Sequence, residues 1–416
     1  MPSRAWRRAA AVPALLLLLS ATHCCAWHSV HYRGKIFSAL HSDLLPWTRR
    51  KVNATSLVET RRASGDNNIA GFALIDGRVF MTSLTDRLDI LAQEASRVHL
   101  YMSCKLLQAM FSAPLGTNLE VFVKVGDRPV VNQDSFDRNF ALVVSPASAP
   151  GFLDVRGPHW FTNVDHICEK DYDNTAFDER KPVLFGRYTH FCQYNPKPIK
   201  LPEELHAFSD CQRTYFAQLA KQHPSLMDVG PTNYVPSPPN PRREYGAPGT
   251  FDKKPRVPLE SWDEYKYVLA TEGWTFPGKL AKLLALGGVV LIPRTEHIQY
   301  FVDALEPGVH FVPVWEKKKD DVIASIEWLE RNKDEARKIA AKGREFACMA
   351  LIKEERDAWW TEFVRVVTQD VMSGTEPLES YERMVQEKTA IEITANQIEI
   401  DEDQGRCTLH EDTTKR

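Results

Sequence analysis

A single lysine stands where a predicted strand gives way to a predicted helix. The stretch reads "YKYVLATEGWTFPGKLAKLLALGG": an apolar strand ends near Gly273, and a helix starts near Pro277, a residue suited to a first helical turn. Exposed amides at a helix start attract anions such as phosphate, and Lys279 adds a positive charge within that turn. Lys282, one turn further on, either adds to this charge or faces solvent. The spacing alone also fits a surface lysine on an ordinary amphipathic helix.

One carboxylate has a comparable position at the end of another strand. Asp127 lies in the turn "GDRP" directly after "LEVFVKV", a run apolar enough to be an interior strand buried on both faces. Residues just past the carboxyl end of such a strand face the crevice where ligands bind. A carboxylate there can act as a general base, although an aspartate also commonly caps a turn of this kind. The chain has no GxGxxG and no Walker motif, which excludes a standard dinucleotide or ATP site.

The elements around these residues predict an α/β protein with two units. In the first, over 27–194, "IAGFALIDGRVFMTS" indicates a hairpin around Asp76-Gly77. A helical stretch over 85–111 follows, and then two strands, "LEVFVKV" and "FALVVS". Strands that alternate with helices favour a parallel sheet, and two such units joined by an irregular segment predict a cleft between them.

The second unit is predicted over 259–350 and follows an irregular connecting segment over 195–258. Eight prolines between Pro231 and Pro258 argue against regular structure there. The unit ends in two amphipathic helices split near Asn332. Residues 351–416 are expected to form a terminal helix and a polar, charged tail with little structure.

The first 26 residues have the layout of a secretory signal peptide. Three arginines precede a short apolar run and then small residues, and that run is short for a membrane span; a signal anchor is the alternative. We therefore expect no membrane span in the mature chain and a location in the lumen of the secretory pathway, in the endoplasmic reticulum or Golgi. Secretion is also open, because the chain ends "HEDTTKR" without a KDEL-type signal. Asn53 lies in a glycosylation sequon, which is consistent with that route.

Six cysteines remain after removal of the signal, an even number that permits disulfides in an oxidising lumen. Cys168, Cys192 and Cys211 stand in irregular sequence and are the favoured partners. Cys348 has helical spacing in "GREFACMALI" and is expected to be a buried thiol. The composition is that of a globular protein, with 43% hydrophobic and 26% charged residues. The net charge of −3 gives no reason to expect a nucleic-acid partner.

Several motifs together resemble one known family. In order, the chain contains Tyr265-Lys266-Tyr267, Gly273, "LEPGVHFVPV", "IEWLERN" and "IAAKGREF". This succession is similar to the nucleotide-sugar domain of glycosyltransferase family 90, the group of protein O-glucosyltransferases and fungal capsule-associated xylosyltransferases. Upstream, "LEVFVKVGDRP", "GFLDVRGPHWF", "KPVLFGRYTH" and the helix after "CQRTYF" resemble further family elements. The likeness covers about 39–346.

The resemblance implies a GT-B-like fold, with two Rossmann-type domains that face a cleft, and transfer of glucose or xylose from a UDP-sugar with inversion and without a metal or other cofactor. The expected acceptor is a protein serine or a glycan hydroxyl. Asp127 occupies the position of the family's base, and Lys279 that of its diphosphate-binding arginine. The other implied donor contacts are Gly273, Lys282, Arg187, Arg213, His310 and Glu296. His310 fits a donor-phosphate contact and a hydrogen-bonded structural residue equally well.

Four departures from the family pattern lie at the expected donor site. Lys279 keeps the charge of the arginine but not its bidentate fork, Pro277 replaces a serine, and Gly308 replaces a tryptophan. The family's Arg-Gly-Ser has the inverted order Gly186-Arg187-Tyr188. These changes keep open a binding protein without activity on the same fold. A metal-dependent GT-A transferase is the third alternative, because "KDYDN" contains the Asp-x-Asp spacing, at Asp171 and Asp173, that such enzymes use to hold Mn²⁺.

Overall fold

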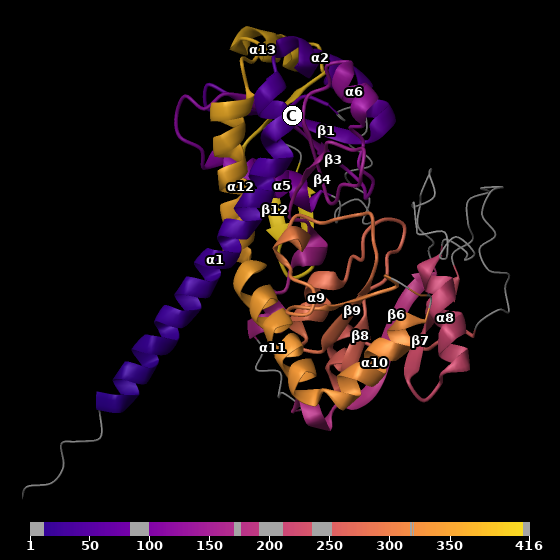
Figure 1. The fold of residues 1–416 in the computed structure, drawn as a ribbon. Coiled ribbons are helices and arrows are strands. Elements are labelled where there is room, and N and C mark those ends of the chain that lie inside the picture. Colours follow the sequence, from indigo (N-terminus) through magenta and orange to yellow (C-terminus); the bar gives the residue numbers. More distant parts are fainter. Residues whose placement is uncertain are drawn as a thin grey trace, which may run out of the picture.

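Two β-sheets, each with helices packed against it, form the body of the protein (Figure 1). The structure is a computed structural model that describes residues 12–83, 100–169, 176–190, 211–234, 252–316, 318 and 320–410. Parallel strand pairs occur in both sheets, which confirms the predicted α/β class. The predicted helical stretch over 85–111 is described only for its last part, where α5 spans Tyr101–Phe111.

The first sheet has six strands in the order β11-β2-β1-β3-β4-β5 and is mixed rather than wholly parallel. Asp76 and Gly77 form the hairpin turn predicted between β1 and β2; both have positive φ, as a tight two-residue turn requires. β3 lies between β1 and β4, and all six of its residues are buried, so the predicted interior strand is confirmed. The strands span Ile391–Ile393 (β11), Arg78–Met81 (β2), Ile69–Ile75 (β1), Leu119–Lys124 (β3), Val143–Ser145 (β4) and Val155–Arg156 (β5).

The second sheet has five strands, all parallel, in the order β10-β9-β8-β6-β7. Its strands span Val312–Val314 (β10), Val289–Pro293 (β9), Tyr265–Leu269 (β8), Lys181–His190 (β6) and Met227–Tyr234 (β7). This sheet begins earlier in the chain than the sequence boundaries place it. β6 lies inside the predicted first unit, and β7 with its helix α8 (Gln212–Gln222) lies inside the predicted irregular segment. The prolines of that segment misled the prediction, because Pro231 stands within β7 itself.

The helices cover the faces of the sheets and join them. α1 packs along α11 and α12, so the beginning and the later part of the chain lie side by side (Figure 1). α10 and α11 are the two amphipathic helices predicted around Asn332. The helices not yet bounded are α1 (Val12–Arg50), α2 (Ala54–Asn67), α6 (Gln133–Asp137), α7 (Asp165–Glu169), α9 (Leu280–Ala285), α10 (Asp321–Arg331), α11 (Lys333–Ala350), α12 (Lys353–Val366) and α13 (Leu378–Gln386).

The polar end of the chain is structured, contrary to the sequence prediction. α13 packs on the first sheet through the buried side chain of Tyr381, and β11 adds a strand to the edge of that sheet beside β2. A hairpin of β12 (Ile398–Asp401) and β13 (Arg406–Leu409) follows and carries Cys407, which pairs with Cys104 of α5. The polar composition did not predict this structure, because edge strands and hairpins outside the core are short and bury only part of their side chains.

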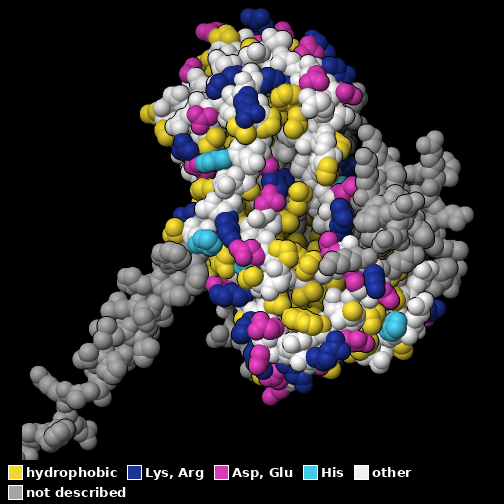
Figure 2. All heavy atoms as spheres, in the orientation of Figure 1, with side chains coloured by type: hydrophobic (Ala, Val, Ile, Leu, Met, Phe, Trp, Pro, Cys, Tyr) yellow, Lys and Arg dark blue, Asp and Glu magenta, His cyan; other side chains and the backbone are white. Residues whose placement is uncertain are grey.

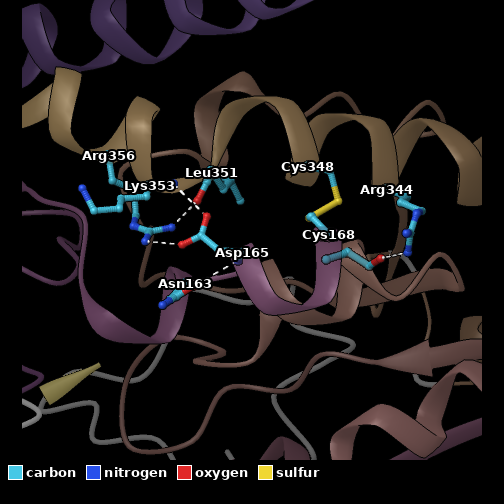
Figure 3. Close-up of a disulfide and its surroundings, with 9 residues drawn as sticks. Asn163, Asp165, Cys168, Arg344, Cys348, Leu351, Lys353 and Arg356 are labelled. Carbon is cyan, nitrogen blue, oxygen red and sulfur yellow. Dashed lines mark hydrogen bonds and ion pairs between the residues drawn. A yellow bond between two sulfur atoms is a disulfide. The ribbon is translucent and has the colours of Figure 1, made fainter. Parts of the chain in front are cut away.

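A second disulfide joins Cys168 of α7 to Cys348 of α11, with the two Cα atoms 5.4 Å apart (Figure 3). The prediction that Cys348 is a free buried thiol is therefore wrong; its helical position is compatible with a partner on a facing helix. Cys168 is paired as expected, and Cys211 is also disulfide-bonded. Cys192 lies outside the described residues.

The surface carries basic and acidic side chains that are interspersed on the face shown in Figure 2, in line with the near-neutral net charge. No helix in the described part of the chain combines the length and the apolar character needed to cross a membrane. Asn53 of the sequon is exposed, and its side-chain oxygen caps α2 by accepting from the Ser56 amide at 3.0 Å.

The Cys168–Cys348 disulfide closes a loop of 180 residues, so it restricts the unfolded chain strongly. We expect the double variant Cys168→Ser/Cys348→Ser to lose about 2–5 kcal/mol of unfolding free energy, measured by denaturant titration. The oxidised parent protein, with its disulfides intact, is the comparison. Free thiols at both positions in the oxidised parent, detected by mass spectrometry after alkylation, would contradict the pairing.

Candidate functional site

A cavity of about 910 Å³ lies where loops from the two sheets meet. Asp127 reaches it from the loop after β3, and the remaining predicted residues that line it come from the second sheet and its helices: Arg187, Arg213, Gly273 and Lys279. The cavity thus collects residues that are far apart in the sequence at the carboxyl ends of β3, β6 and β8, where ligands bind in sheets of this type. Arg256 adds a further cation, and Asp127 is the only acidic residue among the lining residues that the structure describes.

Lys279 directly precedes α9 and lines the cavity. Its Nζ donates to the carbonyl oxygen of Arg187 at 3.0 Å and lies 4.6 Å from the ring centroid of Trp262. The surrounding protein lowers the pKa of Lys279 to about 8, first by desolvation and then by repulsion from Arg213 and other cations. An anion in the cavity would relieve both effects, because it replaces lost solvation and offsets the repulsion.

Arg213 projects from α8 beside the loop that follows β8. Its guanidinium donates to the Thr189 carbonyl oxygen at 2.5 Å and approaches the Thr271 hydroxyl at 3.3 Å. Gly273 makes this position possible: a Cβ there would lie 2.7 Å from Nη2 of Arg213. Burial lowers the pKa of Arg213 to about 10, and Tyr188 and the buried carboxylate of Glu272 partly oppose that shift. Within the described residues, neither Arg213 nor Lys279 forms an ion pair with a carboxylate.

Arg187 lines the same cavity but is already paired. It lies in β6, is 5% exposed, and donates through Nη2 to the Asp228 carboxylate of β7 at 2.7 Å. Its Nη1 donates to the Asp228 carbonyl oxygen at 2.6 Å, whereas its buried Nε has no hydrogen-bond partner in the described part of the chain. Arg187 therefore contributes less free positive charge to the cavity than Arg213 and Lys279.

Asp127 is half-buried in the loop that follows β3. Gly126 precedes it with φ 139°, a conformation that favours glycine and turns the chain sharply at the end of the strand. The next residue, Arg128, lies over the ring of Trp274 at 4.7 Å, so this loop contacts the loop after β8. Lys124, at the end of β3, is close enough to Asp127 for the carboxylate to raise its pKa, although burial dominates and lowers that pKa to about 8.

Three predicted donor contacts do not line this cavity. His310 accepts from the Glu306 amide at 2.9 Å and faces the Tyr32 hydroxyl at 3.4 Å, which favours its structural role over a phosphate contact. Lys282 lies over the ring of Trp160 at 5.3 Å. Glu296 is half-buried in the turn after β9. Asp171 and Asp173, the alternative metal-binding pair, lie outside the described residues.

Sequence reasoning missed the aromatic and some polar walls of the cavity. Trp274 directly follows Gly273 in the loop after β8, and that position could have marked it as a cavity residue. Trp262, by contrast, precedes the strand and reaches the cavity only because of how the chain folds. The other lining residues without a sequence prediction include Phe161, Tyr188, Thr189, Thr271 and Phe276.

The sequence from 211 to 399 matches the model of the family described as glycosyl transferase family 90. This match includes α8 with Arg213, the loop after β8 and the Lys279 turn. The fold and the cavity define an α/β protein with a basic site between two sheets. This match and the similar proteins support membership of glycosyltransferase family 90, the family that the motifs resemble.

Similar proteins include protein O-glucosyltransferase 3 of Homo sapiens, 29% identical over 136 residues, which cover 32% of this chain and 25% of that protein. The O-glucosyltransferase rumi homolog of Aedes aegypti is 25% identical over 254 residues, 60% of each chain. A protein of Frog virus 3 named 027R is 32% identical over 181 residues, 40% of this chain and 19% of its own. The matched part thus spans between about a fifth and three fifths of the length of these relatives.

We expect Lys279 to make the affinity for UDP depend on pH. Between pH 7 and 9 the unoccupied site loses the Lys279 proton near pH 8, and binding of an anion must then recover it, so affinity should fall as the pH rises, by at most about tenfold per pH unit. Lys279→Ala should weaken binding at pH 7, and Lys279→Arg, which stays charged, should flatten the pH profile. Calorimetric titration measures all three.

The matched control is Lys282→Ala, which removes a lysine of α9 that does not line the cavity. Its UDP affinity should remain near that of the parent. Equal affinity in Lys279→Ala and the parent would remove Lys279 from the site.

Proposed function

We propose that this protein is an inverting glycosyltransferase that moves glucose or xylose from a UDP-sugar to the hydroxyl of a protein serine or a glycan, without a metal ion. In this proposal the two sheets belong to the two facing domains of a GT-B-like arrangement. The observation that carries the proposal is the composition of the cavity. One carboxylate, Asp127, comes from the first sheet, and the second contributes the cations Arg213 and Lys279, which form no ion pair within the described residues.

The proposed reaction uses these groups on opposite sides of the sugar. Asp127 accepts the proton of the acceptor hydroxyl while the acceptor oxygen forms a bond to the anomeric carbon. The bond from that carbon to the diphosphate breaks, and its electron pair leaves with UDP. Arg213 and Lys279 stabilise the negative charge that develops on the diphosphate. Attack opposite the leaving group inverts the configuration at the anomeric carbon.

Glucose is the first donor sugar to test, because two of the similar proteins are named O-glucosyltransferases. Xylose follows from the resemblance to the wider family. Trp262 and Trp274 give the cavity apolar walls of the kind on which a sugar or a base can stack. The signal-like N-terminal sequence and the disulfides support a location in the lumen of the secretory pathway.

Asp127→Asn is the most direct test of the proposal. The substitution is nearly isosteric but removes the base, so turnover should fall by about 10²–10⁴-fold while UDP affinity and thermal stability stay close to the parental values. The measurements are transfer of labelled sugar, calorimetry with UDP and thermal unfolding. Near-parental transfer by the variant would reduce Asp127 to a turn residue.

A binding protein on the same fold is the competing function, and the pairing of Arg187 with Asp228 is the observation in its favour, because it leaves fewer cations for the leaving group. A screen of UDP-sugars separates the two. UDP binding with no turnover of any donor, either by hydrolysis or by transfer, would identify the binding protein.

Activity should persist in EDTA. In the proposed site the diphosphate charge is met by Arg213 and Lys279, so a divalent ion has no required place. We expect equal initial rates with EDTA and with added Mn²⁺. Activity that disappears in EDTA and returns with Mn²⁺ would refute the metal-independent mechanism and bring back Asp171 and Asp173 as ligands.

A further inference from the structure

The loop that carries Asp127 is short and is fixed at both ends. At its start, the Val125 amide donates to the Asn68 carbonyl oxygen at 2.9 Å. At its end, the Val130 and Val131 amides donate to one buried carboxylate, that of Asp154. Only 126–129 lie between these two points, and Pro129 has a restricted backbone. The position of Asp127 therefore depends on both ends.

The carboxylate of Asp154 is a specific receptor for this loop. Its Oδ2 accepts from the Val131 amide at 2.8 Å, and its Oδ1 accepts from the Ser145 hydroxyl at 2.6 Å. The Val130 amide lies within hydrogen-bond distance of both oxygens, at 2.9 and 3.0 Å. Asp154 is 2% exposed, and a carboxylate so deeply buried is costly unless such bonds compensate it. These bonds oppose the effect of burial, which raises the pKa of Asp154 to about 6.

Two further contacts make the end of the loop rigid. The Leu153 amide donates to the Val131 carbonyl oxygen at 2.7 Å, and Asn132 forms a bridge with Phe152. Asn132 then caps α6 by accepting from the Ser135 amide at 2.9 Å. The segment before β5 and the end of the Asp127 loop are thus held together by several hydrogen bonds, and most of these bonds go to the carboxylate of Asp154.

Asp154 also shares an electrostatic partner with Asp127. The buried ammonium of Lys124 at the end of β3 is stabilised by both carboxylates, with Asp154 the stronger of the two. Lys124 therefore links the two carboxylates electrostatically. Asp154 itself is not among the residues that line the cavity, so it can act on a bound substrate only through the loop.

We propose that Asp154 is a positioning residue for the base: by holding the Val130 and Val131 amides it sets where Asp127 stands in the cavity. The proposal rests on the proposed function, since it assigns Asp154 a task in that reaction. A displacement of about 1 Å at a reacting group costs roughly 10²-fold in rate. Loss of the hydrogen bonds between Asp154 and the Val130 and Val131 amides should therefore lower kcat. The donor site, which is built on the second sheet, should remain unchanged.

Asp154→Asn is a suitable probe because it keeps the shape of the side chain. The NH₂ group of the asparagine can replace either oxygen of the native carboxylate. Because the Val130 N–H contacts both oxygens, it faces an NH₂ group, which cannot accept its hydrogen bond, in either case. We expect kcat for transfer to fall by about 10- to 10²-fold, with the donor KM and the affinity for UDP unchanged. Hydrogen exchange at the Val130 and Val131 amides should become faster, because the acceptor that protects them is weakened.

The decisive arm is the double variant Asp127→Asn/Asp154→Asn. If Asp154 acts only through Asp127, the double variant should be no slower than Asp127→Asn alone. The control is Asp134→Asn, the same chemical change on an exposed residue of α6 just beyond the loop, which should keep the parental kcat.

Three results would overturn the proposal: a parental kcat in Asp154→Asn, additive losses in the double variant, or an equal rise in donor KM and fall in kcat that indicates general damage. A loss of kcat with unchanged exchange at Val130 and Val131 would also overturn it, because the loop would then not be the route. A parent protein that transfers no sugar would instead refute the proposed function, while the exchange measurement would still report whether Asp154 holds the loop.

Discussion

The buried guanidinium of Arg356 in α12 holds together a junction between α12 and α7, and the position of the cavity wall depends on this junction. It donates to the Leu351 carbonyl oxygen at 2.6 Å and to the Asp165 carboxylate at 2.8 Å, and the Lys353 amide donates to the other oxygen of Asp165 at 2.8 Å (Figure 3). The Cys168–Cys348 disulfide lies one turn of α7 away. Loss of one partner of such a buried pair typically costs about 3–5 kcal/mol, because the other charge stays buried without compensation.

This junction reaches the site through a short path in the chain. α7 follows the 3₁₀ turn Trp160–Thr162, whose Phe161 forms part of the cavity wall. The ring of Phe161 packs so closely on Gly278 that a Cβ there would lie 3.3 Å from it. Gly278 directly precedes Lys279, so the segment that Arg356 fastens also limits where the Lys279 turn can lie. The disulfide and the ion pair thereby connect α11 and α12 to the segment that contributes Phe161 to the cavity.

Two of the four departures from the family pattern have separate physical reasons. Gly308 has φ +76° in a turn closed by its own amide and the Phe311 carbonyl oxygen, so a tryptophan there would be strained. Gly308 does not line the cavity. Arg187 and Gly186 exchange places relative to the family order, and a one-residue exchange in a strand moves a side chain to the other face of the sheet. In this chain Arg187 forms an ion pair with Asp228, and that carboxylate offsets its positive charge.

The sequence by itself determined the α/β class, the hairpin at Asp76-Gly77, the interior strand before Asp127, the strand and turn before Lys279 and the likeness to glycosyltransferase family 90, because apolar runs, turn residues and motif spacing are local signals. It also named five residues that share one cavity. Only the tertiary structure decided that Cys348 pairs with Cys168, that the segment after Met372 completes the first sheet, and that β6 and β7 belong to the second. It also showed that His310 and Lys282 do not line the cavity, that Trp262 does, and that Asp154 accepts hydrogen bonds from the end of the Asp127 loop. These outcomes depend on contacts between residues far apart in the chain, which no local pattern encodes.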